Sequence, residues 1–350
     1  NNNRFFGKGI LTFLSRIIGL SSRGDKIPTN EIHYTTADNS VLTIEKLSCF
    51  GKGQNVSNSY DPDKNVCILK FDKDVTEIGE EAFCACKSLT SIIIPPSVTE
   101  IGNGAFDGCS SLTRITVSKG NKVYDSREDC NAIIHTESNT LIRGCENTII
   151  PPSVREIGGH AFDGCSSLTR ITIPPSVREI GGHAFDGCSS LTRIIIPPSV
   201  REIRWHVFGG CSSLTSISIP LLLTKIGRSA FYGCSSLRSI TIPPSVTEIW
   251  GWAFYGCSSL TRISIPPSVT EIGDVAFYGC SSLTSISIPP SVTQIGSSAF
   301  YGCSSLTSIT IPPSVREIGD GAFSGCSSLT SISIPESVRE IGWDAFSGCS

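Results

Sequence analysis

The sequence predicts a solenoid, in which short coils of chain stack on one another around a continuous core. A phenylalanine recurs every 23 residues, at positions 83 and 106 and again from 162 to 346. Apolar residues repeat with the spacing L-x-x-I-x-I, as in Leu283, Ile286 and Ile288. A fixed period of about 20 to 29 residues with this spacing is typical of a leucine-rich repeat solenoid. We expect an α/β-type leucine-rich repeat fold, with a parallel β-sheet on the concave face and short strands, turns or single helical turns on the convex face.

One repeat unit shows how each coil is built. Leu283, Ile286 and Ile288 point inward from a short strand, which ends at Pro289 because proline cannot continue a β-ladder. A second apolar pair and a turn then lead to Phe300, which fills the far side of the coil. One coil cannot bury its own apolar edges, so the stability of the array accumulates as coils stack.

The chain is expected to have three parts. Residues 1–30 form an N-terminal amphipathic segment or linker, either an interfacial membrane helix or a helix that packs on an upstream domain. Residues 31–65 form an N-terminal cap over the open end of the core. Residues 66–350 form the solenoid, with an irregular insert at about 118–147 that either joins the stack or projects as a loop. Within this insert, residues 132–142 read as a hairpin. The absence of methionine at position 1 and the final mid-repeat residues suggest a fragment of a longer protein, truncated at its C-terminus.

Composition excludes some functions and leaves the redox compartment open. A net charge of −3 does not indicate strong attraction to nucleic acid. Eleven of the 16 cysteines stand three residues after a phenylalanine of the repeat, one per coil, without the C-x2-C pairs of zinc sites. We expect these thiols to be buried and reduced, although neighbouring coils lie within disulfide reach.

The repeat and several other stretches follow one joint pattern. The repeat reads I-P-P-S-V-T-E-I-G-x-x-A-F-x-G-C-S-S-L-T-S-I. The other stretches are residues 30–35, 71–76, 121–127, 130–134 and 139–145. Together they resemble the BspA-like leucine-rich repeat surface proteins. The resemblance covers residues 30–350. It implies an extracellular or cell-surface location, adhesion to host matrix proteins, cells or other microbes, and no catalytic residues.

The outward positions of the predicted concave strands are candidate binding residues. Most carry hydroxyl groups, as in Thr284, Ser285 and Ser287. Arginine replaces serine or threonine in several coils, namely at Arg114, Arg170, Arg193, Arg238 and Arg262. Such a face can hydrogen-bond a partner protein or a glycan across many repeats; it can equally be a solvated β-surface.

Two aromatic columns flank the repeated phenylalanine. Tyr232, Tyr255, Tyr278 and Tyr301 stand one residue after it in successive coils. They either dock a glycan or protein or pack on one another. Histidines stand two residues before it at positions 160, 183 and 206, with aspartates nearby. Because residues 155–170 and 178–193 are identical, duplication explains two of these histidines, and we predict neither a metal site nor a cofactor.

No nucleophile–base motif, phosphate-binding loop or metalloprotease signature is present in the sequence, so we do not expect an enzyme. A further column of glutamates, several preceded by arginine, predicts a solvated charged face. The first functional hypothesis is a surface recognition or adhesion module that binds an extracellular matrix protein, a cell-surface protein or a glycan by avidity. The alternatives are a structural spacer or stalk that presents another domain, and an intracellular protein-interaction scaffold.

Overall fold

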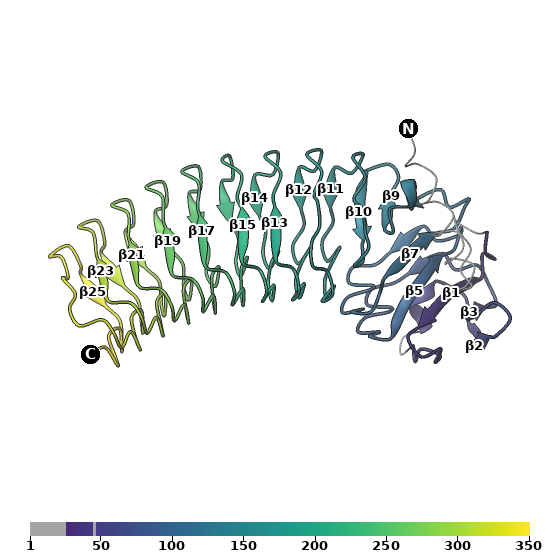
Figure 1. Ribbon diagram of the computed structural model, residues 1–350, viewed down its shortest axis with the longest axis horizontal. Coiled ribbons are helices and arrows are strands. Elements are labelled where there is room, and N and C mark those ends of the chain that lie inside the picture. The colour runs from purple at the N-terminus through teal and green to yellow at the C-terminus, as the bar shows by residue number, and fades with distance from the viewer. Residues whose placement is uncertain (1–25, 45–46) are drawn as a thin grey trace, which may run out of the picture. The chain divides into compact units, whose positions relative to one another are not determined.

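The computed structural model describes residues 26–44 and 47–350 (Figure 1). Its chain divides into two compact units, Asn1–Pro151 and Pro152–Ser350. Most of the N-terminal segment expected at 1–30 lies outside the described residues. In the part of the chain that is described, the helices are two short 3-10 turns, η1 (Leu47–Phe50) and η2 (Arg127–Asp129). None is long or apolar enough to cross a bilayer.

The described residues of the first unit form ten strands. They are β1 (Glu31–Thr36), β2 (Asn55–Asp61), β3 (Val66–Phe71), β4 (Glu77–Ile78), β5 (Leu89–Ile94), β6 (Glu100–Ile101), β7 (Arg114–Val117), β8 (Tyr124–Asp125), β9 (Ile133–His135) and β10 (Thr140–Arg143). The main sheet has the order β2-β3-β1-β5-β7. Strand β1 is antiparallel to both β3 and β5, so it separates the first two repeat strands, whereas β5 and β7 pair in parallel.

The hairpin expected within residues 132–142 is confirmed. Strands β9 and β10 pair antiparallel, with Leu141 opposite Ile134, and β8 pairs antiparallel with β9. Ile133, Ile134 and Leu141 are fully buried. The hairpin is therefore packed into the first unit and does not project as a loop.

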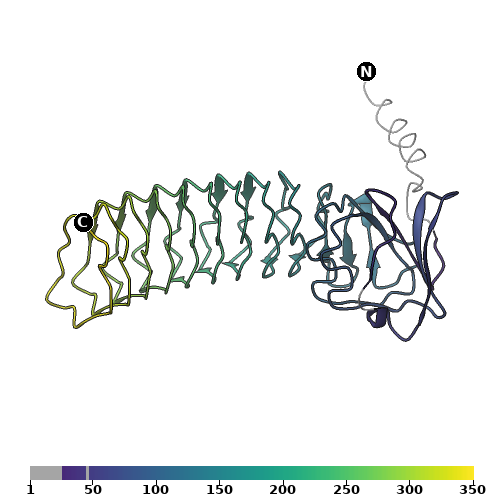
Figure 2. The same cartoon turned by 90° about the horizontal axis from the view of Figure 1, so that it is seen from below.

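The second unit consists of stacked 23-residue coils, which confirms the predicted solenoid (Figures 1 and 2). One side of six successive coils carries a three-residue strand: β13 (Arg193–Ile195), β15 (Ser216–Ser218), β17 (Ser239–Thr241), β19 (Arg262–Ser264), β21 (Ser285–Ser287) and β23 (Ser308–Thr310). The coils before and after them have only isolated bridges, at Arg170 and Ser333. These strands pair in parallel with equivalent residues opposite each other, as in Ile286 with Ile309.

A second side of each coil carries a two-residue strand, which we call the Glu-Ile ladder. Its members are β11 (Glu156–Ile157), β12 (Glu179–Ile180), β14 (Glu202–Ile203), β16 (Lys225–Ile226), β18 (Glu248–Ile249), β20 (Glu271–Ile272), β22 (Gln294–Ile295), β24 (Glu317–Ile318) and β25 (Glu340–Ile341). Turns, rather than helical turns, close the third side. There the Phe254 N–H donates to the Ala276 carbonyl of the next coil at 2.8 Å.

The core of the second unit is a set of columns in which identical side chains stack. The phenylalanine rings of neighbouring coils lie nearly parallel, with centroids 5.3 Å apart on either side of Phe254. Phe254, Cys257 and Val269 are fully buried. Because each column is continuous, every internal coil buries its apolar edges against the coils before and after it.

Glycine recurs at two positions of the coil for different reasons. Gly256 has φ +68°, in the left-handed region that side chains disfavour. At Gly296, a Cβ would lie 2.6 Å from the Asp274 backbone nitrogen of the preceding coil, so a side chain there requires the backbone to shift. The second position is not always glycine, since Arg204 and Trp250 occupy it in two coils.

The position two residues before each phenylalanine is also left-handed, and here glycine is not the rule. We call it the left-handed slot. Gly321 occupies it in one coil with φ 59°, and Val275 in another with φ 60°. His160, His183 and His206 have φ between 53° and 59°. Left-handed geometry is costly for β-branched residues in particular, so stacking imposes it whatever the side chain.

Candidate functional site

The strand face of the second unit comprises the outward residues of the strands β13, β15, β17, β19, β21 and β23, the residue preceding each strand, and Arg170, which forms an isolated parallel bridge with Arg193 of β13. Thr284, Ser285 and Ser287 are exposed on it. So are four of the predicted arginines, Arg170, Arg193, Arg238 and Arg262. The fifth, Arg114, lies in β7 of the first unit, opposite Ser91, and is half-buried. The structure therefore brings together four of the five arginines within one unit.

These four arginines are not neutralised within the strand face. The outward positions of β13 to β23 carry only serine, threonine, isoleucine and arginine. Among the described residues, no ion pair or side-chain hydrogen bond involves the guanidinium groups of Arg170, Arg193, Arg238 or Arg262. Arg170 and Arg193 even stand opposite each other in a parallel bridge, where like charges repel. The strand face is therefore positively charged where these arginines lie.

The threonine column of this face forms hydrogen bonds between neighbouring coils. The Thr307 hydroxyl donates to the Thr284 carbonyl of the preceding coil at 3.2 Å, and Thr261 donates likewise to the Arg238 carbonyl at 3.2 Å. The Thr284 hydroxyl makes the same contact at 3.5 Å. The threonine hydroxyls therefore hold neighbouring coils together, and the serine and arginine rows supply most of the remaining side-chain donors of this face.

The four predicted tyrosines form a stacked column. Centroids of successive rings lie 4.6–4.9 Å apart, with interplanar angles of 6–13°. Neighbouring rings cover both faces of Tyr255 and Tyr278, which leaves their edges accessible. Tyr232 and Tyr301, at the two ends, are the more exposed. A sugar ring cannot stack on the two inner faces, so any role in binding belongs to the ring edges, the phenol groups and the terminal rings.

The three histidines continue this aromatic column from the other direction. Their centroids lie 4.7 Å apart between His160 and His183 and 4.8 Å between His183 and His206. His206 then approaches Tyr232 at 6.0 Å. An open depression borders this point, lined by His183, Trp205, His206, Arg228, Ser229, Tyr232 and Trp252.

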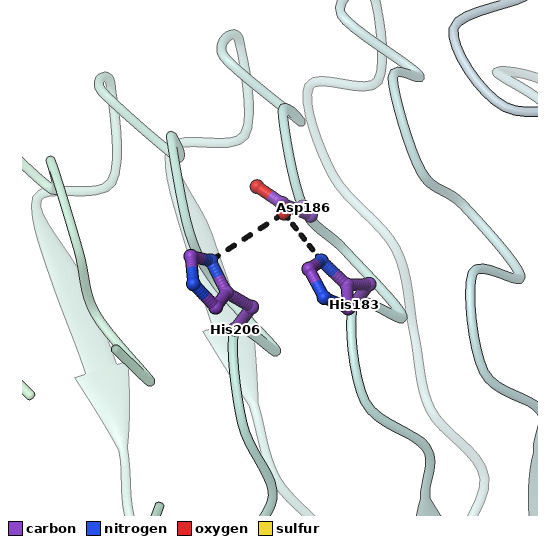
Figure 3. A group of neighbouring side chains, drawn as sticks. All are labelled: His183, Asp186 and His206. Carbon is purple, nitrogen blue, oxygen red and sulfur yellow. Dashed lines mark hydrogen bonds and ion pairs between the residues drawn. The ribbon is translucent and has the colours of Figure 1, made fainter. Parts of the chain in front are cut away.

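Asp186 joins two of the histidines into a cluster that the sequence analysis did not predict (Figure 3). Its Oδ2 lies 2.6 Å from Nδ1 of His183 and 3.6 Å from Nδ1 of His206. Burial lowers the pKa of His206, an effect that the Asp186 charge partly opposes. The cluster's sequence signal is a histidine followed three residues later by aspartate, with a second histidine one period further on.

The Glu-Ile ladder carries exposed ion pairs. Arg204 bridges Glu179 at 3.1 Å and Glu202 at 2.7 Å, and Lys225 contacts Glu248 at 3.3 Å. These side chains are 40–56% exposed, and such pairs contribute roughly 0–1 kcal/mol each. This side of the coils is a solvated charged face, as predicted.

The repeated cysteines are buried thiols. The Sγ of Cys280, for example, donates to the Phe254 carbonyl of the preceding coil at 3.2 Å. Cys211, Cys234, Cys257, Cys303 and Cys326 make the equivalent bond. Burial raises the pKa of the Cys257 thiol to about 12. The column is therefore a structural element with little thiolate to offer a metal or an oxidant.

Comparison with known families gives one match that spans the array. Residues 56–140, 133–261 and 252–350 match the model of the BspA type leucine-rich repeat region, in six copies. No curated protein matches the chain.

Solved structures of bacterial repeat proteins are also similar. A leucine-rich cell surface protein from Faecalibacterium prausnitzii is 29% identical, with a TM-score of 0.50; the match covers 85% of this chain and 86% of that one. A leucine-rich repeat protein from Bacteroides ovatus is 26% identical over 85% of this chain and 91% of that one, with a TM-score of 0.44. A leucine-rich repeat protein from T. pallidum is 32% identical over 65% and 85%, with a TM-score of 0.31.

Proposed function

Since the chain belongs to the BspA-type leucine-rich repeat family, we propose that it is a non-catalytic recognition module that works outside the cell. The partner is an extracellular matrix protein, a cell-surface protein or a glycan. Repeat proteins of this family are generally binding modules, and a leucine-rich cell surface protein is among the similar solved structures. The binding surface we propose is the strand face, with the edges of the tyrosine column as an additional contact.

The observation that carries this proposal is the arginine set of the strand face. Arg170, Arg193, Arg238 and Arg262 are exposed, and the face has no carboxylate to pair with them. A planar guanidinium offers several donors in a fixed geometry, which suits carboxylate and sulfate groups. Because the serine rows lie between the arginines, a ligand that extends over several coils gains many small contacts at once.

The test is binding of the purified chain to immobilised fibronectin, fibrinogen and a panel of glycans. In the test variant, Arg170, Arg193 and Arg262 are changed to serine and Arg238 to threonine, the residues that their rows carry in other coils. The matched control changes Arg155, Arg178, Arg201 and Arg316 to threonine, the residue that their row carries at Thr224 and Thr247. Both variants lose four positive charges, and all eight arginines are exposed.

We expect saturable binding that weakens at least about tenfold in the strand-face variant and much less in the control, since four exposed charged contacts contribute roughly 2–4 kcal/mol together. Equal losses in both variants would show non-specific attraction to net charge and would contradict the strand face as the binding site. If the folded wild-type chain binds none of these ligands, the alternative function as a structural stalk is favoured, because a stalk requires only that the coils stack.

A further inference from the structure

We propose that His183, Asp186 and His206 form a binding site for a divalent transition cation of the zinc class (Figure 3). The three residues bring one ligand atom each to within 4.8 Å of one another. This cluster lies in the aromatic column and shares no residue with the strand face, so the proposal is independent of the recognition function.

The solenoid places these residues together although a phenylalanine separates them along the chain. His183 occupies the left-handed slot, two residues before Phe185, and Asp186 follows that phenylalanine directly. The left-handed backbone turns the histidine back toward the aspartate, and their side chains meet at 2.6 Å. Stacking then adds His206 from the next coil, one period later.

The nitrogen and oxygen atoms of this cluster are of the types that bind zinc, and their separations are close to those around a tetrahedral zinc ion. Two imidazole nitrogens and one carboxylate oxygen are a common protein ligand set for zinc, which leaves a fourth position for water or another ligand. Around a tetrahedral ion with bonds of about 2.0–2.1 Å, ligand atoms lie about 3.3 Å apart. The distances from Asp186 Oδ2 to the two Nδ1 atoms, 2.6 and 3.6 Å, bracket this value.

One side chain must rotate for an ion to bind. The rings of His183 and His206 are stacked at an interplanar angle of 9°, so an ion in the plane of one imidazole lies outside the plane of the other. His206 is the more exposed of the two, and its Nδ1 is beyond hydrogen-bonding distance from Asp186. Rotation about its Cβ–Cγ bond, for which histidine has a broad range, brings this nitrogen toward the ion.

Two neighbouring side chains have opposite effects on cation binding at this cluster. Trp205 packs edge-to-face on His183, with centroids 4.3 Å apart, and shields the site from water on that side. Arg228 lines the same depression and opposes a cation by charge. Because other coils carry serine one residue before the slot, as at Ser297, changing Arg228 to serine is expected to tighten cation binding several-fold.

The experiment is a titration of the whole chain with CoCl₂, followed by competition with ZnCl₂. Cobalt reports its ligands through its visible absorption, and it quenches tryptophan fluorescence near the site. The test variants are His206→Ser and Asp186→Ser. Both substitutions are already accommodated in the repeat, since Ser229 occupies the slot and Ser324 follows a phenylalanine. The control is His135→Ser, which removes a histidine of the first unit.

We expect one equivalent of cobalt to bind with a nitrogen and oxygen ligand spectrum, zinc to displace it, and both test variants to weaken binding at least tenfold. The His135→Ser and His160→Ser variants should stay within threefold of wild type. Three results would overturn the proposal: no saturable binding; a thiolate-to-cobalt charge-transfer band, which would place the ion on cysteine; or loss of binding in His160→Ser but not in His206→Ser.

Discussion

Replacement of Phe254 by alanine tests whether the stacked phenylalanines stabilise each coil through its two neighbours. Phe254 is fully buried, and its ring lies 5.3 Å from Phe231 on one side and 5.3 Å from Phe277 on the other. A buried Phe→Ala change costs about 3–5 kcal/mol, because it removes the ring from the core and leaves a cavity. Phe346 is only half-buried and has one stacked neighbour, Phe323, at 5.4 Å. The same change there is expected to cost roughly 1–2 kcal/mol.

The buried cysteines report this effect coil by coil. Cys257 belongs to the same coil as Phe254, and Cys280 donates its thiol to the Phe254 carbonyl; both are fully buried. When closing is faster than labelling, the alkylation rate of a buried thiol follows the population of the open coil. A loss of 3 kcal/mol therefore accelerates labelling by about 100-fold. Iodoacetamide labelling mapped by mass spectrometry measures these rates.

In Phe254→Ala we expect this acceleration at Cys257 and Cys280 and less than about a threefold change at Cys326, three coils away, because each coil contacts only its neighbours. Phe346→Ala should affect only the thiols of the last two coils. Uniform acceleration along the whole second unit would refute the reasoning, since it would mean that the array opens as one block.

Three further predictions follow from local geometry. Val275→Gly should raise the free energy of unfolding by about 1 kcal/mol in urea titrations, because a β-branched residue is strained in the left-handed slot; destabilisation would show that its packing outweighs the strain. In the native chain, the half-buried Cys49 and Cys349 should react with Ellman's reagent, whereas the fully buried thiols should react only after denaturant unfolds the protein. Immediate reaction of all thiols would contradict the buried cysteine column. Burial raises the pKa of Glu31, but hydrogen bonds from His33 and Lys70 outweigh it and lower the pKa below 4.5. A lowered pKa stabilises the fold above that value, and this stabilisation disappears as the pH falls through the folded pKa. In Glu31→Gln, the free energy of unfolding of the first unit should therefore fall less steeply below about pH 4.5 than in the wild type. An unchanged pH dependence in this range would contradict the prediction.

The repeat period was sufficient to predict the coils and their core columns, because an apolar residue recurs at a fixed spacing and only one stacking arrangement buries all of them. The hairpin at β9 and β10 lies in the irregular insert, outside this period, and was predicted from two short apolar runs on either side of a polar turn. The position of β1 between β3 and β5 was not predictable in this way. Alternation identifies a strand but contains no information about its direction or its partners.

The candidate site was predictable only in part. The exposed arginine row follows from the alternation of inward and outward residues, yet its division between two units, with Arg114 in β7, depends on the path of the chain through the insert. The His183–Asp186–His206 cluster was only partly predictable. The sequence shows the recurring histidines with aspartates nearby, but duplication was a sufficient explanation for two of the histidines, so no metal site was predicted. The left-handed slot that brings His183 to Asp186 is not marked by glycine, since histidine, serine, tryptophan and valine also occupy it.

The constant offset of the contacts between coils has a genetic consequence. Backbone hydrogen bonds such as that from Phe254 to Ala276 recur in the next coil as Phe277 to Ala299, always 22 residues ahead. Deleting or duplicating one whole period therefore gives every remaining residue an equivalent partner, and only the number of coils changes. Unequal recombination between the near-identical copies can lengthen or shorten the array in a single event without a folding defect. Variants of this protein that differ by multiples of 23 residues are expected to be folded, and they would present binding surfaces of different lengths.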